Sequence, residues 1–412
     1  MYDLILLLTL SILGYKLLLK LISQYHDTFI NSGFHGKDLN KPNKSLIPEA
    51  QGVLAGCVYL LILYTFLPFL FSSQISSDRL VSHIFKIFKT PTEDEAVYHI
   101  FLGKYLAALQ SICFMVLLGF ADDALDLRWK HKLILPTMAT LPLLIAHFIL
   151  IGNTRVVIPV VIRDILMFDS IDIGFFYYVY MGMLAVFCTN AINIYAGVNG
   201  LEVGQSCIIS ISLLIFNFIE ETNNDGHRFS IYFLIPFLMI SLAMLKQNWY
   251  PAKIFVGDSY CYFAGITFAS VGILGHFSKT LLLFFIPQTI NFMLSLPQLF
   301  KMIPCPRHRL PTLSPNESDQ LLIPSTHVVK VESLSSVGKL FLRLSEMIGM
   351  CQLKEKSEEV KVVNFTLINL CLVWFGPCRE DILTIRLLIF QILCSCLGFV
   401  IRYPLAGLLY NQ

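Results

Sequence analysis

Ten apolar runs, each close to the length that crosses a bilayer, constrain this 412-residue chain more than any other feature. A helix needs about 20 apolar residues to span the hydrocarbon layer. The runs lie at 4–22, 53–71, 100–120, 133–151, 174–194, 203–219, 231–245, 260–276, 280–300 and 385–403. Charged residues make up 14% of the chain, against about 25% in soluble domains. The sequence therefore predicts an all-α polytopic membrane protein with about ten transmembrane helices.

Composition also narrows the classes of partner. The formal net charge is only +2, whereas a domain that binds nucleic acid usually has a strongly basic face. We therefore expect membrane lipid, and no nucleic acid, as a partner. The eleven cysteines lie mostly in apolar runs and show no zinc-spaced CxxC pair, which predicts buried thiols.

Nearly every unusual polar cluster falls in alternate loops, which share one face of the membrane. Loops after odd-numbered helices cover 23–52, 121–132, 195–202, 246–259 and 301–384. We therefore expect one active site at that face. Short loops on the two faces carry similar numbers of Lys and Arg, so the flanking cations decide the orientation. The flanking cations favour a cytoplasmic site, with both termini on the other side. They are Lys16, Lys20, Lys301, Arg307 and Arg309.

The stretch 301–384 is too long for a turn and too polar to span. Segments 327–332 and 359–366 are β-like, and apolar residues between 337 and 348 recur at helical spacing. We predict a small β-α-β insertion between the ninth and tenth helices. The expected divisions are a transmembrane catalytic core at 1–300, a cytoplasmic insertion at 301–384, and the last helix with the C-terminus at 385–412.

Two acidic features end or begin apolar runs. Asp122 and Asp123 close the third run, where a carboxylate costs roughly 2.5–3.5 kcal/mol at bilayer depth and favours a nearby cation. A solvated helix end is the alternative. Asp258 and Asn193 together offer oxygen ligands of the kind Mg²⁺ prefers. Separately, Asp258 fits a helix N-cap, and Asn193 fits an interhelical hydrogen bond.

Two further segments suit phosphate groups. The Gly-rich turn at 196–200 could cradle an anion or a flat base, although such turns are often plain connectors. Arg307, His308 and Arg309 lie on a proline-bracketed loop, where guanidinium groups could bind pyrophosphate bidentately or form a basic surface patch. Together with the acidic and metal-binding groups, these segments predict phosphoryl transfer to a lipid substrate.

Five motifs then carry a resemblance, at 119–132, 190–206, 254–258, 275–279 and 304–309. They resemble the polyprenyl-phosphate sugar-1-phosphate transferase superfamily, and the Cys-Pro-Arg-His-Arg motif is similar to its eukaryotic dolichol branch. The resemblance implies transfer of GlcNAc-1-phosphate from UDP-GlcNAc to dolichyl phosphate with release of UMP. It implies the first committed step of N-glycan precursor synthesis in the endoplasmic reticulum membrane, with Mg²⁺ as cofactor and a homodimer as assembly.

The resemblance also implies roles for individual residues. Asn193 and Asp258 would be the Mg²⁺ ligands, and Asp122 would orient Lys132 or deprotonate the acceptor, with Asp123 as support. Dolichyl phosphate would contact Lys132 and the stretch Val186, Phe187, Cys188, Thr189, Asn190, Ala191, Ile192, Asn193 and Ile194. UDP-GlcNAc would contact Lys37, Asp38, Leu39, Glu49 and Asn199, with its uracil between Gly197 and Phe255. Its pyrophosphate and N-acetyl sugar would contact Arg307, His308 and Arg309, with Trp129 nearby.

Three alternatives stay open from the sequence. Transfer could proceed by direct attack of the lipid phosphate, or in two steps through a phosphorylated Asp122 or Asp123. A transporter would place its polar clusters near the bilayer midplane with inverted internal symmetry. A relative acting on another sugar or polyprenol differs from the expected enzyme only by the resemblance of the motif at 305–309.

Overall fold

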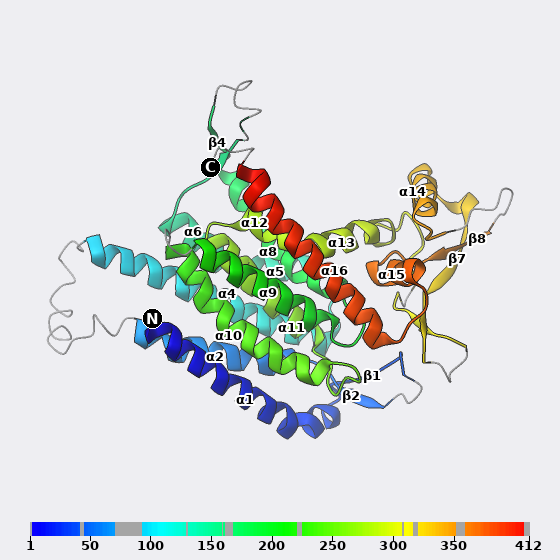
Figure 1. Cartoon of the computed structure of the whole chain (residues 1–412), viewed down its shortest axis with the longest axis horizontal. Helices are drawn as coiled ribbons and strands as arrows, with labels where there is room; N and C mark the ends of the chain where they lie inside the picture. The colour runs from blue at the N-terminus through cyan, green and yellow to red at the C-terminus, as the bar shows by residue number, and fades with distance from the viewer. Residues whose placement is uncertain are drawn as a thin grey trace.

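A bundle of long helices forms most of the molecule (Figure 1). The computed structural model describes residues 2–41, 45–70, 93–128, 131–158, 160, 168–220, 225–306, 309–315, 320–351 and 359–407. The helices of the bundle are α1 (Tyr2–Asn31), α2 (Gly52–Leu70), α4 (Glu93–Leu125), α5 (His131–Ala139), α6 (Leu141–Leu150), α8 (Phe175–Ile194), α9 (Leu201–Glu220), α10 (Asp225–Asn248), α11 (Gly257–Leu274), α12 (Ser278–Phe284), α13 (Ile286–Leu299) and α16 (Glu380–Val400). A π-helical turn, Ile401–Leu405, continues α16.

The predicted all-α polytopic class is confirmed. Within the described residues, eight helical segments are long and apolar enough to cross a membrane, and the pair α12 and α13, bent by 73°, makes a possible ninth. Pro287 lies in the first turn of α13, directly after the bend, where its missing N–H costs no helical hydrogen bond. Each of the ten predicted runs corresponds to a helix or a pair of consecutive helices.

Helix α11 is the exception among the predicted spans, because it is not apolar enough to count as one by itself. Every residue from Ser259 to Leu274 is buried by neighbouring helices, so Ser, Thr and Tyr side chains are tolerated along its length. Its neighbours approach closely. A methyl group added at Gly265 would lie 2.3 Å from Thr189 Cα of α8, and one at Gly119 of α4 would lie 2.5 Å from Ser259 Cα. Small residues thus let α4 and α8 pack tightly against α11.

The insertion contains the predicted β-α-β order. Strand β7 (Thr326–Lys330), helix α14 (Ser336–Met347) and strand β8 (Glu359–Val363) follow one another, and the two strands pair antiparallel with Thr326 opposite Val363. Helix α15 (Leu367–Phe375) then leads to α16, which begins at Glu380 rather than at 385. A hairpin of β5 (Thr312–Leu313) and β6 (Leu322–Ile323) precedes β7. A second hydrophobic cluster, including Val329, Val362, Leu370 and Leu383, joins this region to α16.

One end of the bundle gathers the segments that were expected to share a face. The antiparallel pair β1 (His35–Lys37) and β2 (Leu46–Pro48) lies at the same end as the insertion and the start of α16 (Figure 1). The N-terminus, the end of α16 and the hairpin of β3 (Arg155–Val157) and β4 (Ser170–Asp172) lie toward the other end. All eleven cysteines are free thiols, and Cys57, Cys305 and Cys396 are exposed in the isolated chain.

Candidate active site

A lysine joins the two acidic motifs at the loop-bearing end of the bundle. Lys132, in the first turn of α5, places Nζ 3.0 Å from Asp122 Oδ1 and 2.9 Å from Asp258 Oδ2. Asn193 Nδ2 donates to Asp258 Oδ1 at 2.8 Å. Four side chains from α4, α5, α8 and α11 therefore meet in one place. Because one ammonium touches both carboxylates, the ends of α4 and α11 that carry them lie on the same side of the membrane.

Asp122 is held by donors on both of its oxygens. Tyr262 OH donates to Oδ2 at 2.8 Å, and the backbone N–H of Leu127 donates to Oδ1 at 3.1 Å, the oxygen that also pairs with Lys132. The residue is 2% exposed. This arrangement fixes the carboxylate and, through it, the position of the Lys132 ammonium group.

Asp123 has a different role from its neighbour in the sequence. Its Oδ1 accepts the backbone N–H of Asp258 at 2.7 Å, and its Oδ2 accepts that of Ser259 at 3.0 Å. These amides belong to the first turn of α11, whose N–H groups have no partner within the helix. Gly257 adopts φ +73°, and a Cβ there would lie 2.5 Å from Asp123 Oδ2, so glycine is required. Asp123 thus caps α11 from α4 and sets the position of Asp258.

A cavity of about 350 Å³ opens beside Asp258, within the range of about 300–1,000 Å³ typical of small-ligand sites. Nine of the predicted residues line it: Lys37, Asp38, Leu39, Glu49, Asn193, Gly197, Asn199, Phe255 and Asp258. No role was predicted for six further lining residues, Gly36, Asn40, Glu202, Asn248, Cys261 and Leu310. Segments from five different parts of the chain therefore form one polar pocket.

The lining of this cavity includes an aromatic ring, Phe255, and a glycine turn at Gly197. The N–H of Phe255 donates to Pro48 O at 2.8 Å, which ties the ring to the β2 segment. Gly197 adopts φ +115° and lies against the side chain of Leu310. The Glu49 carboxyl, also in the wall, has its pKa raised by burial and by the charge of nearby Asp258. An aromatic ring and a glycine turn that line the same cavity are suited to contact with a flat heterocycle.

A separate apolar groove of about 500 Å³ runs between α5 and α8. Five predicted lipid contacts line it, namely Val186, Phe187, Asn190, Ala191 and Ile194, together with residues such as Leu133, Thr137, Gly182 and Phe292. Asn193 lies outside the groove and lines the polar cavity. The last turn of α8 therefore faces the cavity on one side and the groove on another.

The prediction that every residue from Val186 to Ile194 contacts the lipid is wrong for three side chains. Cys188, Thr189 and Ile192 are fully buried in the core, and the backbone of Cys188 and Thr189 packs against Gly265 of α11. A helix turns through several faces in nine residues, so a continuous stretch cannot all line one groove. Only the face that carries Val186, Asn190 and Ile194 does so.

Arg309 does not point into the cavity, contrary to the prediction. Its Nη2 donates to Ser295 Oγ at 2.8 Å and to Phe365 O at 2.6 Å, and burial lowers its pKa. The guanidinium group thereby fastens the insertion to α13, while the following residue, Leu310, reaches the cavity. Trp129, Arg307 and His308 lie outside the described residues.

The metal prediction depends on two ligands. Among the residues that the structure describes, no group of three His, Cys, Asp or Glu side chains could hold a metal ion. Asn193 and Asp258 supply one amide and one carboxylate at the cavity wall, and the Asp258 side chain is 23% exposed. Mg²⁺ is commonly held by one or two carboxylates together with water and substrate phosphates. The donor set therefore fits Mg²⁺ bound jointly with a phosphorylated ligand.

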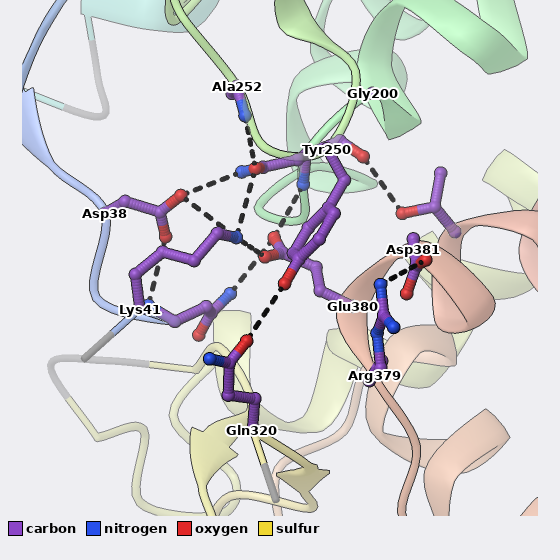
Figure 2. Close-up of polar contacts among 12 residues, drawn as sticks. Asp38, Lys41, Gly200, Tyr250, Ala252, Gln320, Arg379, Glu380 and Asp381 are labelled. Carbon is purple, nitrogen blue, oxygen red and sulfur yellow. Dashed lines mark hydrogen bonds and ion pairs between the residues drawn. The ribbon is translucent and has the colours of Figure 1, made fainter. Parts of the chain in front are cut away.

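Sequence reasoning missed a buried ion cluster behind the cavity. Lys41 pairs with Glu380 in the first turn of α16, and with Asp38 at 3.4 Å (Figure 2). Glu380 and Asp381 begin an apolar run as Asp122 and Asp123 end one, which was an available signal. A carboxylate in the first turn of a helix is ordinarily explained by the helix dipole, so this signal alone is weak.

Comparison with known proteins agrees with this geometry. Residues 105–276 match the family described as glycosyl transferase family 4. UDP-N-acetylglucosamine--dolichyl-phosphate N-acetylglucosaminephosphotransferases from three organisms are similar over most of their length. The one from Saccharomyces cerevisiae is 43% identical, over 98% of this chain and 92% of that protein. The Schizosaccharomyces pombe protein is 40% identical over the same shares. The Dictyostelium discoideum protein is 41% identical, over 93% of this chain and 85% of its own.

The region 105–276 contains Asp122, Lys132, Asn193 and Asp258, the four side chains that meet around the Lys132 ammonium group, and Asp123, which caps α11. The similarity to the two fungal proteins covers 98% of this chain, so it takes in the insertion and the last helix. The chain therefore belongs to the family of UDP-N-acetylglucosamine–dolichyl-phosphate N-acetylglucosaminephosphotransferases.

Proposed function

We propose that this chain transfers GlcNAc-1-phosphate from UDP-GlcNAc to dolichyl phosphate, giving dolichyl-diphospho-GlcNAc and UMP. The observation that carries the proposal is that a polar cavity and an apolar groove share the last turn of α8, with Lys132 paired to Asp258 between them. A water-soluble nucleotide sugar suits the cavity, and a polyprenyl chain suits the groove.

The lipid phosphate is expected at Lys132. Leu133 and Thr137 follow it on α5 and line the groove, so a chain in the groove would bring its headgroup to the start of α5. The ammonium group donates to Asp122 and Asp258, which leaves one of its three N–H groups for a phosphate oxygen. Asp122, bonded to Tyr262, keeps that ammonium group in place.

The cofactor we propose is Mg²⁺, held by Asn193 and Asp258 together with the nucleotide pyrophosphate. When bound, Mg²⁺ neutralises charge on the pyrophosphate and orients it for displacement. Asp123 contributes indirectly, because its two hydrogen bonds to the first turn of α11 hold the backbone of Asp258.

We propose direct attack of the dolichyl phosphate oxygen on the β-phosphorus of UDP-GlcNAc, with UMP as leaving group. Both oxygens of Asp123 accept backbone N–H groups, and both oxygens of Asp122 accept donors. Neither carboxylate is presented as a free nucleophile, which favours one step over a phosphorylated Asp. A phosphate monoester is mostly ionised near neutral pH, with a second pKa of about 6, so no base is required.

We further propose that the cavity faces the cytoplasm from the endoplasmic reticulum membrane, and that the protein works as a homodimer in the first committed step of N-glycan precursor synthesis. The orientation is supported by flanking cations such as Lys16, Lys20 and Lys301. The compartment and the assembly are supported by the family. A transporter is disfavoured because the polar residues lie at helix ends rather than at mid-bundle.

The test is UMP release by purified full-length protein given UDP-GlcNAc and dolichyl phosphate, with and without Mg²⁺. We expect release only when both substrates and Mg²⁺ are present. Asp258→Ala protein should insert normally and lose Mg²⁺-dependent turnover, whereas Lys339→Met, on the exposed part of α14, should keep it. No UMP from the wild-type protein under these conditions would reject the activity, and near-full turnover by Asp258→Ala would reject the metal role.

A further inference from the structure

An ion cluster lies behind the cavity, away from the proposed reacting groups. The Lys41 ammonium group contacts Glu380 Oε2 directly and lies 3.4 Å from Asp38 Oδ2. The side chain of Glu380 is 2% exposed and that of Lys41 is 15% exposed. Buried charges are costly unless they are paired and hydrogen-bonded, so this cluster requires a specific arrangement of its neighbours.

Glu380 is bonded to two separate parts of the cavity wall. Its Oε1 accepts the backbone N–H of Asn199 at 2.7 Å and an amide N–H of Asn40 at 3.4 Å. Asn40 and Asn199 line the cavity, whereas Glu380 and Lys41 do not. Glu380 therefore holds two residues of the cavity wall in position by hydrogen bonds, although its own side chain does not line the cavity.

Asn199 is the point where these contacts converge. Its Nδ2 donates to Asp38 Oδ2 at 3.2 Å, and its Oδ1 accepts from Lys41 Nζ at 3.2 Å and from the Ala252 N–H at 3.0 Å. Its backbone carbonyl accepts the hydroxyl of Thr384 at 2.9 Å. The first turns of α16 thus hold the backbone of Asn199 from both its N–H and its carbonyl, and one side-chain N–H is left for a ligand.

Tyr250 covers the ion pair. The Lys41 ammonium lies 4.0 Å from the centroid of the Tyr250 ring, and the Arg379 guanidinium carbon lies 5.6 Å from it. The Tyr250 hydroxyl donates to Gln320 Oε1 of the insertion at 3.4 Å (Figure 2). The ring limits access of water to the pair, which strengthens the interaction between the charges.

We propose that Glu380, through Lys41, is a positioning residue that sets the affinity of the cavity for the uridine nucleotide. The proposal rests on the proposed function and adds a role for the last membrane helix. Loss of the Glu380 charge leaves a buried ammonium group shared only between Asp38 and neutral acceptors. The Lys41 ammonium group then interacts more strongly with Asp38 and with Asn199 Oδ1. As a result, Asp38 and Asn199 move within the cavity wall that the nucleotide contacts.

The test compares steady-state kinetics of full-length wild-type and Glu380→Gln protein. Gln keeps an acceptor for the Asn199 N–H and removes only the charge. We expect the KM for UDP-GlcNAc and the inhibition constant of UMP to rise together by about 10- to 100-fold, the effect typical of changing a residue that orients a metal ligand. UMP lacks the sugar, so a parallel rise places the effect at the uridine end. The KM for dolichyl phosphate and kcat should change little.

Asp381→Asn is the matched control, because it removes the same charge one residue along and its partner, Arg379, is half-exposed at the surface. Lys41→Met combined with Glu380→Gln removes both buried charges. This double variant should give a smaller nucleotide defect than the sum of the two single changes. If Glu380→Gln cannot be purified as folded protein, Glu380→Asp, which keeps the charge on a shorter chain, should show the same selective rise.

The proposal is overturned if Glu380→Gln changes nucleotide affinity no more than Asp381→Asn, or if both substrates lose affinity equally. Failure of the proposed function is distinct, because wild-type protein would then release no UMP at all. The ratio of variant to wild-type constants tests the role of Glu380, and the wild-type rate tests the activity.

Discussion

Replacing Lys132 by Met tests the central contact of the site. Met keeps the apolar stem and removes the ammonium group that lies 3.0 Å from Asp122 and 2.9 Å from Asp258. At an effective dielectric constant near 20, each contact at that distance corresponds to a Coulomb energy of about 5 kcal/mol. The side chain is 24% exposed and the two carboxylates repel each other, so most of this energy does not appear as a net contribution.

The kinetic effect of Lys132→Met depends on the contact between the ammonium group and the acceptor substrate, dolichyl phosphate. A hydrogen bond to a charged group contributes about 1.5–3 kcal/mol, which corresponds to roughly 10- to 150-fold at about 1.4 kcal/mol per factor of ten. Because the ammonium group would bind the lipid phosphate before and during transfer, the loss should fall mainly on the KM for dolichyl phosphate. The KM for UDP-GlcNAc should change far less, since Lys132 is not part of the cavity wall.

The assay measures initial rates of UMP release while dolichyl phosphate and UDP-GlcNAc are varied in turn. Lys132→Arg should retain part of the affinity, and Lys339→Met on the exposed part of α14 should behave as wild type. A Lys132→Met enzyme with normal affinity for the lipid and a raised KM for UDP-GlcNAc would contradict this assignment. The ammonium group would then be acting on the donor.

Other consequences follow from the same geometry. Asn193→Ala should raise the Mg²⁺ concentration needed for half-maximal rate, because one of the two proposed ligands is lost; an unchanged Mg²⁺ titration would reject that role. Asp123→Asn should lower the free energy of unfolding by about 1.5–3 kcal/mol, because the carboxylate that accepts the Asp258 and Ser259 N–H groups loses its charge. The rate of UMP release should fall with it. Gly182→Leu should raise the KM for dolichyl phosphate only, since the nearest atom, in Leu144, is 3.6 Å from an added Cβ and the new side chain enters the groove. Arg309→Met should make the insertion more sensitive to protease, while a selective loss of UDP-GlcNAc affinity would show that the guanidinium group does reach the ligand.

The parts of the molecule that the sequence predicted well are those that the bilayer dictates. A run of about 20 apolar residues must be helical in lipid, so the spans and the alternation of loops follow directly. The shared position of Asp122 and Asp258 followed from counting spans. The contact of both with Lys132 did not, because it depends on how closely α4 and α8 approach α11 at Gly119 and Gly265.

The errors arise where side-chain direction decides the outcome. Arg309 carries the charge expected of a phosphate ligand, but its guanidinium group donates to Ser295 and to the Phe365 carbonyl and does not line the cavity. Thr189 lies within a stretch that faces lipid in part, yet it points into the core. Glu380 was overlooked because its partner, Lys41, is more than 300 residues away in sequence and no local pattern joins them.

The dense contacts of α11 have a consequence for variants found far from the site. Seven residues of helix separate Gly265 from Asp258, a rise of about 10 Å. An alanine at Gly265 would place its methyl group 2.3 Å from Thr189 Cα, so either α8 or α11 must move, and each of them carries one of the two proposed magnesium ligands. Such a substitution would disable the enzyme while leaving every substrate-contacting side chain intact. A survey of harmful variants based on distance from the ligand would class it as benign.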